Sequence, residues 1–522
     1  MRRVITENTG HPRRWAILGV LVISLLVVVL DNTVLNVAMR TLADPVHGLG
    51  ATQSELEWSI NSYTLVFAGL LFSFGVLGDR WGRKRMLLTG LVLFGLASLL
   101  SAYSQDPGQL IAARAFMGLG GAAIMPVTLS IISNVFDPSE RGKAIGIWTG
   151  SVGLAVAIGP LLGGFLLEHY WWGSVFLINV PIILAGLVAV AILVPESRDP
   201  QPGKVDLVGV VLSVVGLVTL TYGIVDGGEH GFGRVSVWAF ILGGLAVLSL
   251  FLFLESRSTH PSLDVKLFKN ARFSASVASI GLVFFAAMGS FFFGGLYLQA
   301  VRGFSPMETG ALLVPFAVGQ MIFAPLSMTF VKKFGGRAVS AGGILLSGTM
   351  FALMAFWEID TPVWVIVANF FLMGVGMASV MPPAMNTIMA SLPREKAGVG
   401  SAVSNTVRQV SAALGIAVLG SIVAGVYRSQ MTSPIAGLPE PVQDAASESI
   451  TGAYGVVPNI GAAAGPLIDA ANAAFINAMH WAAWGSAIVA AIGVVVSLIW
   501  LPAKTAAAPA SVPEPELVGS RR

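Results

Sequence analysis

The chain alternates long uncharged stretches with short charged ones, and this pattern predicts a membrane protein. A helix needs about 20 apolar residues to cross the roughly 30 Å hydrocarbon core of a bilayer. Fourteen stretches approach or reach that length, so we expect fourteen membrane-spanning helices with little folded chain outside the bilayer. They cover residues 15–39, 58–77, 86–104, 108–132, 143–167, 173–194, 205–225, 236–254, 273–299, 309–331, 338–357, 362–389, 401–426 and 477–501.

Composition agrees with this interpretation. Hydrophobic residues make up 55% of the chain, charged residues 11%, and the mean hydropathy is +0.80, which leaves too little polar surface for a soluble globule. The first stretch follows Arg13 and Arg14 as a signal peptide would. It exceeds a typical signal core and has no obvious small-residue cleavage site before Arg40, so we interpret it as a span. Without cysteine, disulfides and thiolate metal sites are excluded.

The distribution of lysine and arginine predicts the orientation. With a cytoplasmic N-terminus, 24 of the 30 basic residues lie in the N-terminal segment, the C-terminal tail or the loops on the cytoplasmic side. Short cytoplasmic loops carry an excess of Lys and Arg in membrane proteins. We therefore expect a multi-pass protein of the cytoplasmic membrane with both termini inside.

One charged turn between two apolar stretches carries more information than its charge. Its order is Gly75-x-Leu77-x-Asp79-Arg80-x-Gly82-Arg83-Lys84. This order resembles the signature loop of the major facilitator superfamily at every defining position. The resemblance implies a cytoplasmic latch between two helix bundles, with gate roles for Asp79, Gly82 and Arg83 rather than contact with a substrate.

An internal repeat supports the same fold. The segments MGLGGAAIMP at 117–126 and MGVGMASVMP at 373–382 share six of ten residues, and similar loops follow both. Transporters of this kind consist of two related halves. We expect an all-α major facilitator fold with two six-helix bundles and two additional helices between them. The expected parts are a cytoplasmic segment 1–14, an N-terminal bundle 15–194, a linker 195–272 with the extra spans, a C-terminal bundle 273–502 and a disordered cytoplasmic tail 503–522.

Further motifs narrow the resemblance to drug:proton antiporters with fourteen spans, the group of the quaternary-ammonium and multidrug exporters. Asp31 to Ala38 is similar to their first-span motif, and Leu110 to Gly120, which includes Arg114, is similar to the superfamily's proton-coupling helix. Ala155 departs from the antiporter pattern on the fifth span, and Asn61 occupies a position where some cation exporters have an acid. The antiporter-helix residues implied by the resemblance are Gly159, Pro160, Gly163 and Gly164.

Two embedded charges form a candidate proton-coupling pair on physical grounds. An ionised group in hydrocarbon costs at least about 2.5–3.5 kcal/mol, so it usually faces a partner or a wet cavity. Asp31 lies nine residues before Arg40 and Arg114 eight residues after Asp106, which puts both roughly 12–14 Å below the outer boundary. The two groups can meet if spans one and four are neighbours. The pair is either a static salt bridge or a switch that binds and releases a proton as the two groups separate. Arg408 is near mid-depth and either contacts an anionic substrate group or ties its helix to a carbonyl.

The leading functional hypothesis is proton-coupled efflux of amphipathic drugs or toxic compounds by alternating access. The alternatives are a dedicated exporter of one endogenous metabolite, antibiotic or lipid, and a membrane receptor or scaffold that transports nothing. The expected partners are a small amphipathic molecule, protons and the lipid bilayer, without nucleic acid, and the protein is expected to be a monomer. No phosphate loop, metal-spaced histidine cluster or catalytic triad supports an enzyme or a cofactor. Residues 427–476 are expected to form a loop on the outer face, which either caps the cavity or is a passive surface loop. The candidate substrate-binding residues are Asn32, Asn61, Tyr63, Gln299, Asn386 and Arg408.

Overall fold

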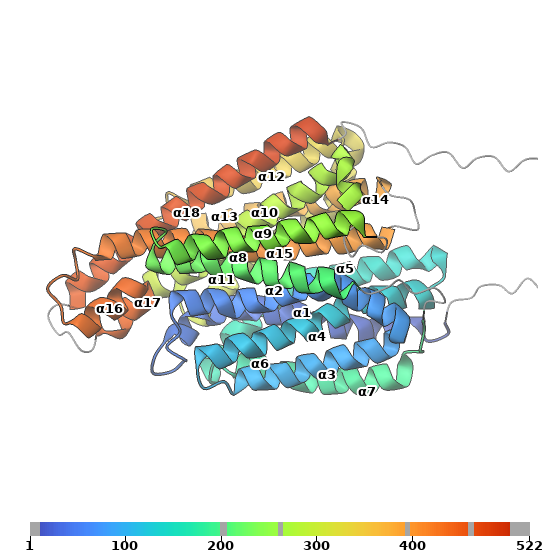
Figure 1. Ribbon diagram of the computed structural model, residues 1–522, viewed down its shortest axis with the longest axis horizontal. Coiled ribbons are helices and arrows are strands. Elements are labelled where there is room, and N and C mark those ends of the chain that lie inside the picture. The colour runs from blue at the N-terminus through green and yellow to red at the C-terminus, as the bar shows by residue number, and fades with distance from the viewer. Residues whose placement is uncertain (1–10, 199–205, 259–264, 392–396, 458–463, 502–522) are drawn as a thin grey trace, which may run out of the picture.

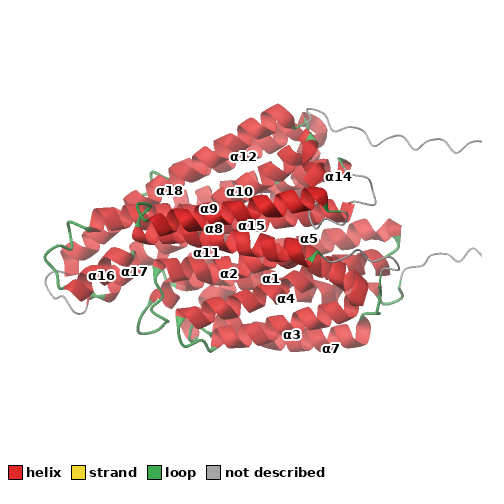
Figure 2. Ribbon diagram, viewed as in Figure 1, coloured by secondary structure: helices red, strands yellow, loops and turns green. Residues whose placement is uncertain are grey.

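The computed structural model describes residues 11–198, 206–258, 265–391, 397–457 and 464–501. These residues form helices joined by loops, with no strand among them (Figure 2). Most of the N-terminal segment, part of the 427–476 loop, the repeated loop after residue 391 and the C-terminal tail lie outside the described residues.

The helices follow the apolar stretches closely. In the N-terminal half they are α1 (Arg14–Ala43), α2 (Gln53–Trp81), α3 (Arg83–Ala102), α4 (Pro107–Val135), α5 (Pro138–His169), α6 (Ser174–Leu177) and α7 (Asn179–Leu193). The linker contributes α8 (Leu207–His230), α9 (Val235–Arg257) and the 3-10 turn η1 (Val265–Lys269). The C-terminal half contains α10 (Ala271–Leu296), the π-helical turn η2 (Tyr297–Val301), α11 (Pro306–Phe334), α12 (Gly336–Met354), α13 (Val363–Ala378), α14 (Met381–Ala390), α15 (Ala397–Met431), α16 (Glu440–Glu448), α17 (Ile450–Gly455) and α18 (Ala464–Trp500).

The number of spans is close to the predicted one. Within the described part of the chain, twelve helices are long and apolar enough to cross a membrane. The bent pair Gln53–Leu71 and Ser73–Trp81 makes thirteen if it is one span. The remaining predicted stretch, 143–167, lies inside α5, which is not among the thirteen. The count of fourteen therefore stays a prediction.

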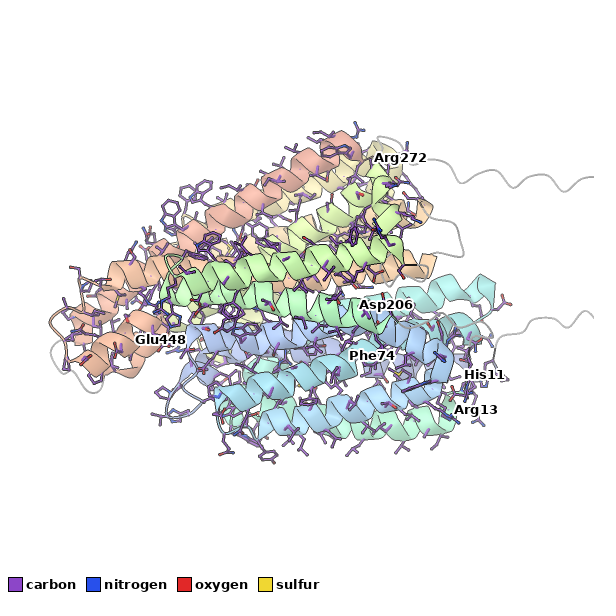
Figure 3. The ribbon with its side chains drawn as sticks, in the orientation of Figure 1. His11, Arg13, Phe74, Asp206, Arg272 and Glu448 are labelled. Carbon is purple, nitrogen blue, oxygen red and sulfur yellow. The ribbon has the colours of Figure 1, made fainter. Side chains whose placement is uncertain are left out.

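The bundle has two distinct ends. Figure 3 shows Arg13 and Arg272 at one end, while Glu448 lies at the other, where α16 and α17 cover the helix ends. Arg14 at the start of α1 bonds Glu140 at the start of α5, with Nε 2.5 Å from Oε2. We call this the basic end, because the charged turns after α2 and α11 also lie here, and we call the opposite one the far end.

The two halves repeat the same packing. The offset of 256 residues between the repeated segments pairs Gly118 with Gly374, and Gly120 with Gly376. An added Cβ would lie 2.6 Å from the Tyr63 carbonyl oxygen of α2 at Gly118, and 2.1 Å from the Phe316 carbonyl oxygen of α11 at Gly374. Gly120 and Gly376 approach the next helices, α3 and α12, equally closely. The predicted repeat is thus a repeat of backbone contacts, which only glycine permits at these separations.

The two linker helices cover one side of the seam between the halves. Helix α8 packs against α2 of the N-terminal half, α15 of the C-terminal half and α9 (Figure 1). Leu65 of α2, Leu217 of α8 and Ala413 of α15 form one buried apolar cluster. Helix α8 therefore bridges both halves, whereas α9 packs against α8, and large apolar side chains of α9 such as Leu242 and Phe253 remain exposed.

On the opposite side of the seam, α5 and α11 meet backbone to backbone toward the far end. An added Cβ on Gly310 would lie 2.2 Å from the Pro160 carbonyl oxygen, and one on Gly164 would lie 2.5 Å from Met307 Cα. Without a hydrophobic driving force in lipid, helices associate through such close packing of small residues. This contact holds the two halves together toward the far end.

We expect Gly310→Ala to lower the melting temperature of the detergent-solubilised protein, because the new methyl group meets the backbone of α5. The matched control is Gly342→Ala on α12, where an added Cβ meets nothing within 4 Å. Alanine favours a helix by up to about 1 kcal/mol over glycine, so the control should melt at the same or a higher temperature. Equal melting temperatures for the two variants would show that the α5–α11 contact is not as tight as described.

Candidate functional site

The structure brings Asp31 of α1 and Arg114 of α4 together inside the N-terminal half. The Arg114 Nη1 donates a hydrogen bond to Asp31 Oδ2, and the side chains are 0% and 1% exposed. The depth argument from the sequence required the two helices to be neighbours, and α1 does pack against α4. The pair joins two helices that the chain separates by 83 residues.

The surroundings hold the guanidinium in one orientation. Its Nε donates to the Ser59 carbonyl oxygen of α2 at 3.0 Å. Its Cζ lies 4.6 Å from the centre of the Tyr63 ring and 5.9 Å from that of Phe176, so the cation is packed against aromatic faces. Arg114 Nη2 has no hydrogen-bond partner among the described residues. The two N–H groups of this nitrogen are thus left for water or a ligand group.

Asn179 completes the carboxylate's environment, and the sequence analysis did not assign it a site role. Its Nδ2 lies 3.4 Å from Asp31 Oδ1 and donates to Ser98 Oγ at 3.0 Å. Ser98 in turn donates to the Phe176 carbonyl oxygen at 2.8 Å. The available signal for Asn179 is that it is the one polar residue in the otherwise apolar segment Phe176 to Pro181. The carboxylate therefore has partners on α4 and α7, and α3 supports the second of them.

This arrangement can exchange a proton when the helices move. A carboxylate beside a guanidinium stays ionised, whereas a carboxylate in an apolar environment takes up a proton. Separating α1 from α4 changes the first environment into the second, and the amide of Asn179 can remain bonded to either form. The geometry is compatible with both predicted roles of the pair, a static salt bridge and a proton-binding switch.

Of the predicted binding residues of the N-terminal half, Tyr63 contacts this pair and Asn32 follows Asp31 on α1. Tyr63 lies beneath Arg114 and is fully buried. Asn61 is also fully buried, and neither its Nδ2 nor its Oδ1 has a partner among the described residues. Leaving a buried amide unsatisfied costs about 1–3 kcal/mol per group, so Asn61 is available to a ligand. Asn32 is half-buried, and its Nδ2 donates to the Val28 carbonyl oxygen at 2.9 Å.

The predicted binding residues of the C-terminal half do not form one group. Gln299 is buried in η2, where its Nε2 donates to the Val37 carbonyl oxygen of α1 at 2.9 Å. Asn386 is exposed on α14. Arg408 is half-buried on α15, with Cζ 5.5 Å from the centre of the Phe284 ring, and its Nε has no partner in the described part of the chain.

The predicted gate turn between α2 and α3 is ordered by contacts within its own half. Arg83 Nε lies 2.8 Å from Asp79 Oδ1. Gly82 has φ +117°, a conformation that favours glycine, and an added Cβ would meet Glu196 Oε1 at 2.5 Å. Lys84 bonds to Glu196 through its backbone N–H and to the Ala191 carbonyl oxygen through Nζ. In this conformation the turn is fastened to the segment after α7.

The antiporter-helix residues of α5 form contact points with two different helices. Added Cβ atoms on Gly159 and Gly163 would lie 1.9 Å from Thr33 Oγ1 and 2.9 Å from Val34 Cγ1, both on α1. Gly164 faces α11 instead, as does the carbonyl of Pro160. Helix α5 thus contacts the helix that carries Asp31 and, on its other side, the C-terminal half.

Two buried carboxylates escaped the sequence analysis. Glu57 on α2 is 1% exposed, and its Oε1 would lie 2.3 Å from a Cβ on Gly420 of α15. Glu255 at the end of α9 is 3% exposed. Asp31 is therefore one of three buried acids in the described part of the chain. The signal for Glu57 was the capping box of Thr52 and Glu55, which starts α2 five residues before the predicted span. No group of three metal-ligating side chains is found in the described ranges.

Known proteins of similar sequence cover most of the chain. The chain is 38% identical over 472 residues to the multidrug efflux pump LfrA of Mycolicibacterium smegmatis, covering 90% of this chain and 93% of the relative. It is 34% identical over 471 residues to the methyl viologen resistance protein SmvA of Salmonella typhimurium, covering 89% and 93%. A tetracenomycin C resistance and export protein of Streptomyces glaucescens is 31% identical over 501 residues, covering 94% and 91%.

Solved structures show the same fold at low sequence identity. A bacterial homologue of the human lysosomal transporter Spinster superposes with a TM-score of 0.64 and 18% identity, covering 96% of this chain and 99% of that one. The family model of the Major Facilitator Superfamily matches residues 21–416, which include the Asp31–Arg114 pair, the turn after α2 and both copies of the repeat. The chain belongs to the major facilitator superfamily.

Proposed function

We propose that the protein is a proton-coupled exporter of amphipathic drugs or toxic compounds that works by alternating access in the cytoplasmic membrane. The observation that carries the proposal is the buried Asp31–Arg114 pair at the junction of α1 and α4. Efflux is further supported by the names of the relatives, which include a multidrug efflux pump and resistance proteins.

The proposed cycle uses the pair as the point where proton and substrate compete. With the far end open, protons reach Asp31 from outside, and protonation weakens the hold on a cationic substrate, which leaves. Binding of substrate from the inside favours release of the proton. Moving one charge through the membrane potential supplies about 2.3 kcal/mol per 100 mV. One proton therefore drives export of a neutral substrate electrogenically, whereas exchange against a monocation depends on the pH gradient alone.

The orientation follows from the basic end. We assign it to the cytoplasm, because it carries Arg14, the turn after α2 and Lys332 with Lys333. The far end then faces outward, and the observed α5–α11 contact closes the outer side. Substrate would bind between the halves, near Asn61 and Tyr63 on one side and Arg408 on the other.

A dedicated exporter of one compound remains the second candidate. The similarity to a tetracenomycin C resistance and export protein and to a puromycin resistance protein of Streptomyces alboniger favours it. A panel of chemically unrelated substrates separates the two functions, because a drug exporter transports several members of the panel and a dedicated exporter one.

We expect Asp31→Asn to abolish uphill transport of a fluorescent cationic dye. The measurement is proton-driven uptake of the dye into inverted membrane vesicles, where export appears as accumulation inside. The amide is nearly isosteric but cannot take up and release a proton at this site. The matched control is Asp444→Asn, an exposed aspartate on α16, which should pump like the parent. Gradient-driven accumulation at the parent's rate in Asp31→Asn vesicles would refute the proposed coupling.

We expect Asp79→Asn to lower turnover more than substrate affinity. The change removes the charge that pairs with Arg83 at the gate turn and leaves the binding region untouched. The measurement compares initial transport rates with equilibrium dye binding to the purified protein. An affinity loss with normal turnover would contradict a gating role.

We expect Asn61→Asp to extend export toward dications. Asn61 has an unpaired buried amide on α2, the helix that also contacts Arg114, and a carboxylate there would add a second negative charge for a divalent substrate. Resistance to methyl viologen should rise relative to resistance to a monocation in cells expressing the variant at parental levels. An unchanged ratio in a correctly inserted variant would count against this assignment.

A further inference from the structure

A reciprocal contact joins the two halves at the far end. The Arg40 guanidinium, near the end of α1, donates a hydrogen bond to the main-chain carbonyl of Gln299 in η2. The Gln299 side chain returns a hydrogen bond from Nε2 to the Val37 carbonyl of α1 at 2.9 Å. Each side of the contact therefore supplies one side-chain donor and one main-chain carbonyl acceptor. Because α1 and η2 belong to different halves, the two hydrogen bonds link the halves.

The π-helical turn explains why the Gln299 carbonyl is available. The backbone N–H of Arg302 donates to the Tyr297 carbonyl at 3.0 Å, and that of Phe304 donates to the Leu298 carbonyl at 3.0 Å. Neither backbone N–H bonds to the Gln299 carbonyl, which is therefore free to accept a hydrogen bond from Arg40. π-helical turns of this kind occur often at functional positions, because they change which backbone groups are exposed.

The turn is firmly attached to its own half. The Tyr297 hydroxyl donates to the Glu358 carbonyl at 2.6 Å, and the Arg302 guanidinium donates to the Thr361 carbonyl, both in the loop between α12 and α13. On the other side of the contact, Arg40 lies on the same continuous helix as Asp31. The nine residues between them correspond to roughly 13 Å of helix.

We propose that Arg40 and Gln299 form a clasp that holds the outer gate shut, and that its release is required before Asp31 is exposed to the outer face. The proposal rests on the proposed function for the orientation and for alternating access. The α5–α11 contact is close packing of helix backbones, and the clasp adds two hydrogen bonds to it. These bonds can break and re-form, because the Arg40 and Gln299 donors bond to water when the halves separate. Asp31, which binds the proton, and Arg40 of the clasp then lie on the same helix, α1.

The test measures how often the outer gate opens. The chain contains no cysteine, so Ala317→Cys introduces a single thiol. Ala317 is 1% exposed and lies two turns beyond Gly310 on the same face of α11. It is therefore further from the far end than the α5–α11 contact at Gly310. A membrane-impermeant maleimide added to intact cells reacts with this thiol only when the far end is open, so the labelling rate reports the open fraction.

We expect Arg40→Met in the Ala317→Cys background to raise the labelling rate about tenfold, the order of change for one lost hydrogen bond with a charged partner. Gln299→Leu removes a hydrogen bond between two uncharged groups and should raise the rate about fivefold. Arg40→Met keeps the apolar part of the side chain and removes only its donors. Arg40→Lys keeps a charged donor and should label at close to the parental rate. The matched control is Asn369→Leu, which removes a buried amide that donates to the Met350 carbonyl at 3.0 Å within the C-terminal half. It should label like the parent.

Parental labelling rates in both Arg40→Met and Gln299→Leu would overturn the proposal, as would an equal rise in Asn369→Leu. Because Gln299→Leu alters only a side chain of η2 and Arg40→Met only one of α1, each tests the clasp if the other does not fold. Labelling needs neither substrate nor a proton gradient. Normal pumping by Asp31→Asn would therefore refute the proton-coupling proposal while leaving the clasp to be decided by these rates.

Discussion

The close approach of helix backbones at glycine is the constraint on which the rest of the structure depends. Lipid tails are as apolar as leucine, so helices in a bilayer gain nothing from simply meeting, and they associate through tight packing and hydrogen bonds. Gly118 and Gly374 place α4 and α13 against the carbonyls of α2 and α11. The two halves are built from the same contacts, and α5 uses further glycines to reach α1 and α11.

Function breaks the symmetry of this scaffold. The position that matches Arg114 in the C-terminal half, at the same offset of 256 residues, is Phe370. Its ring packs against Trp357 and Phe291 in an apolar cluster. A buried charge is costly unless it is paired, so a charge pair is kept only where it serves a purpose. The embedded ion pair therefore belongs to the N-terminal half, and the C-terminal half supplies an apolar, aromatic surface at the equivalent place.

Helix α1 connects the elements that the two proposals involve. Asp31 faces Arg114 and Asn179, Thr33 and Val34 contact glycines of α5, and Arg40 reaches η2. The helix is continuous from Arg14 to Ala43, so a shift caused at Asp31 moves the whole element. Packed interfaces with discrete arrangements amplify such small shifts into opening or closing. Coupling between proton binding and the outer gate then requires no further connecting path.

Much of this protein was determined by local sequence pattern. Span length, the position of basic turns, the repeat at 117–126 and 373–382, and the shared depth of Asp31 and Arg114 all follow from patterns of residues close together in the chain. The resemblance to the major facilitator superfamily also came from short motifs, and the family model confirms it. Glu57 was missed because a helix can begin before its apolar stretch does, and only its capping residues mark the start.

The tertiary structure alone decided which side chains meet across the seam. Gln299 was predicted from its type and depth to line the pocket, but its bonds to α1 depend on a π-helical turn that no hydrophobic pattern reveals. Asn179, Ser98 and Arg40 gain their partners from helices far away in the chain. Such contacts arise from the angles and offsets at which whole helices pack, and these are set by many small steric fits between distant residues rather than by any local sequence.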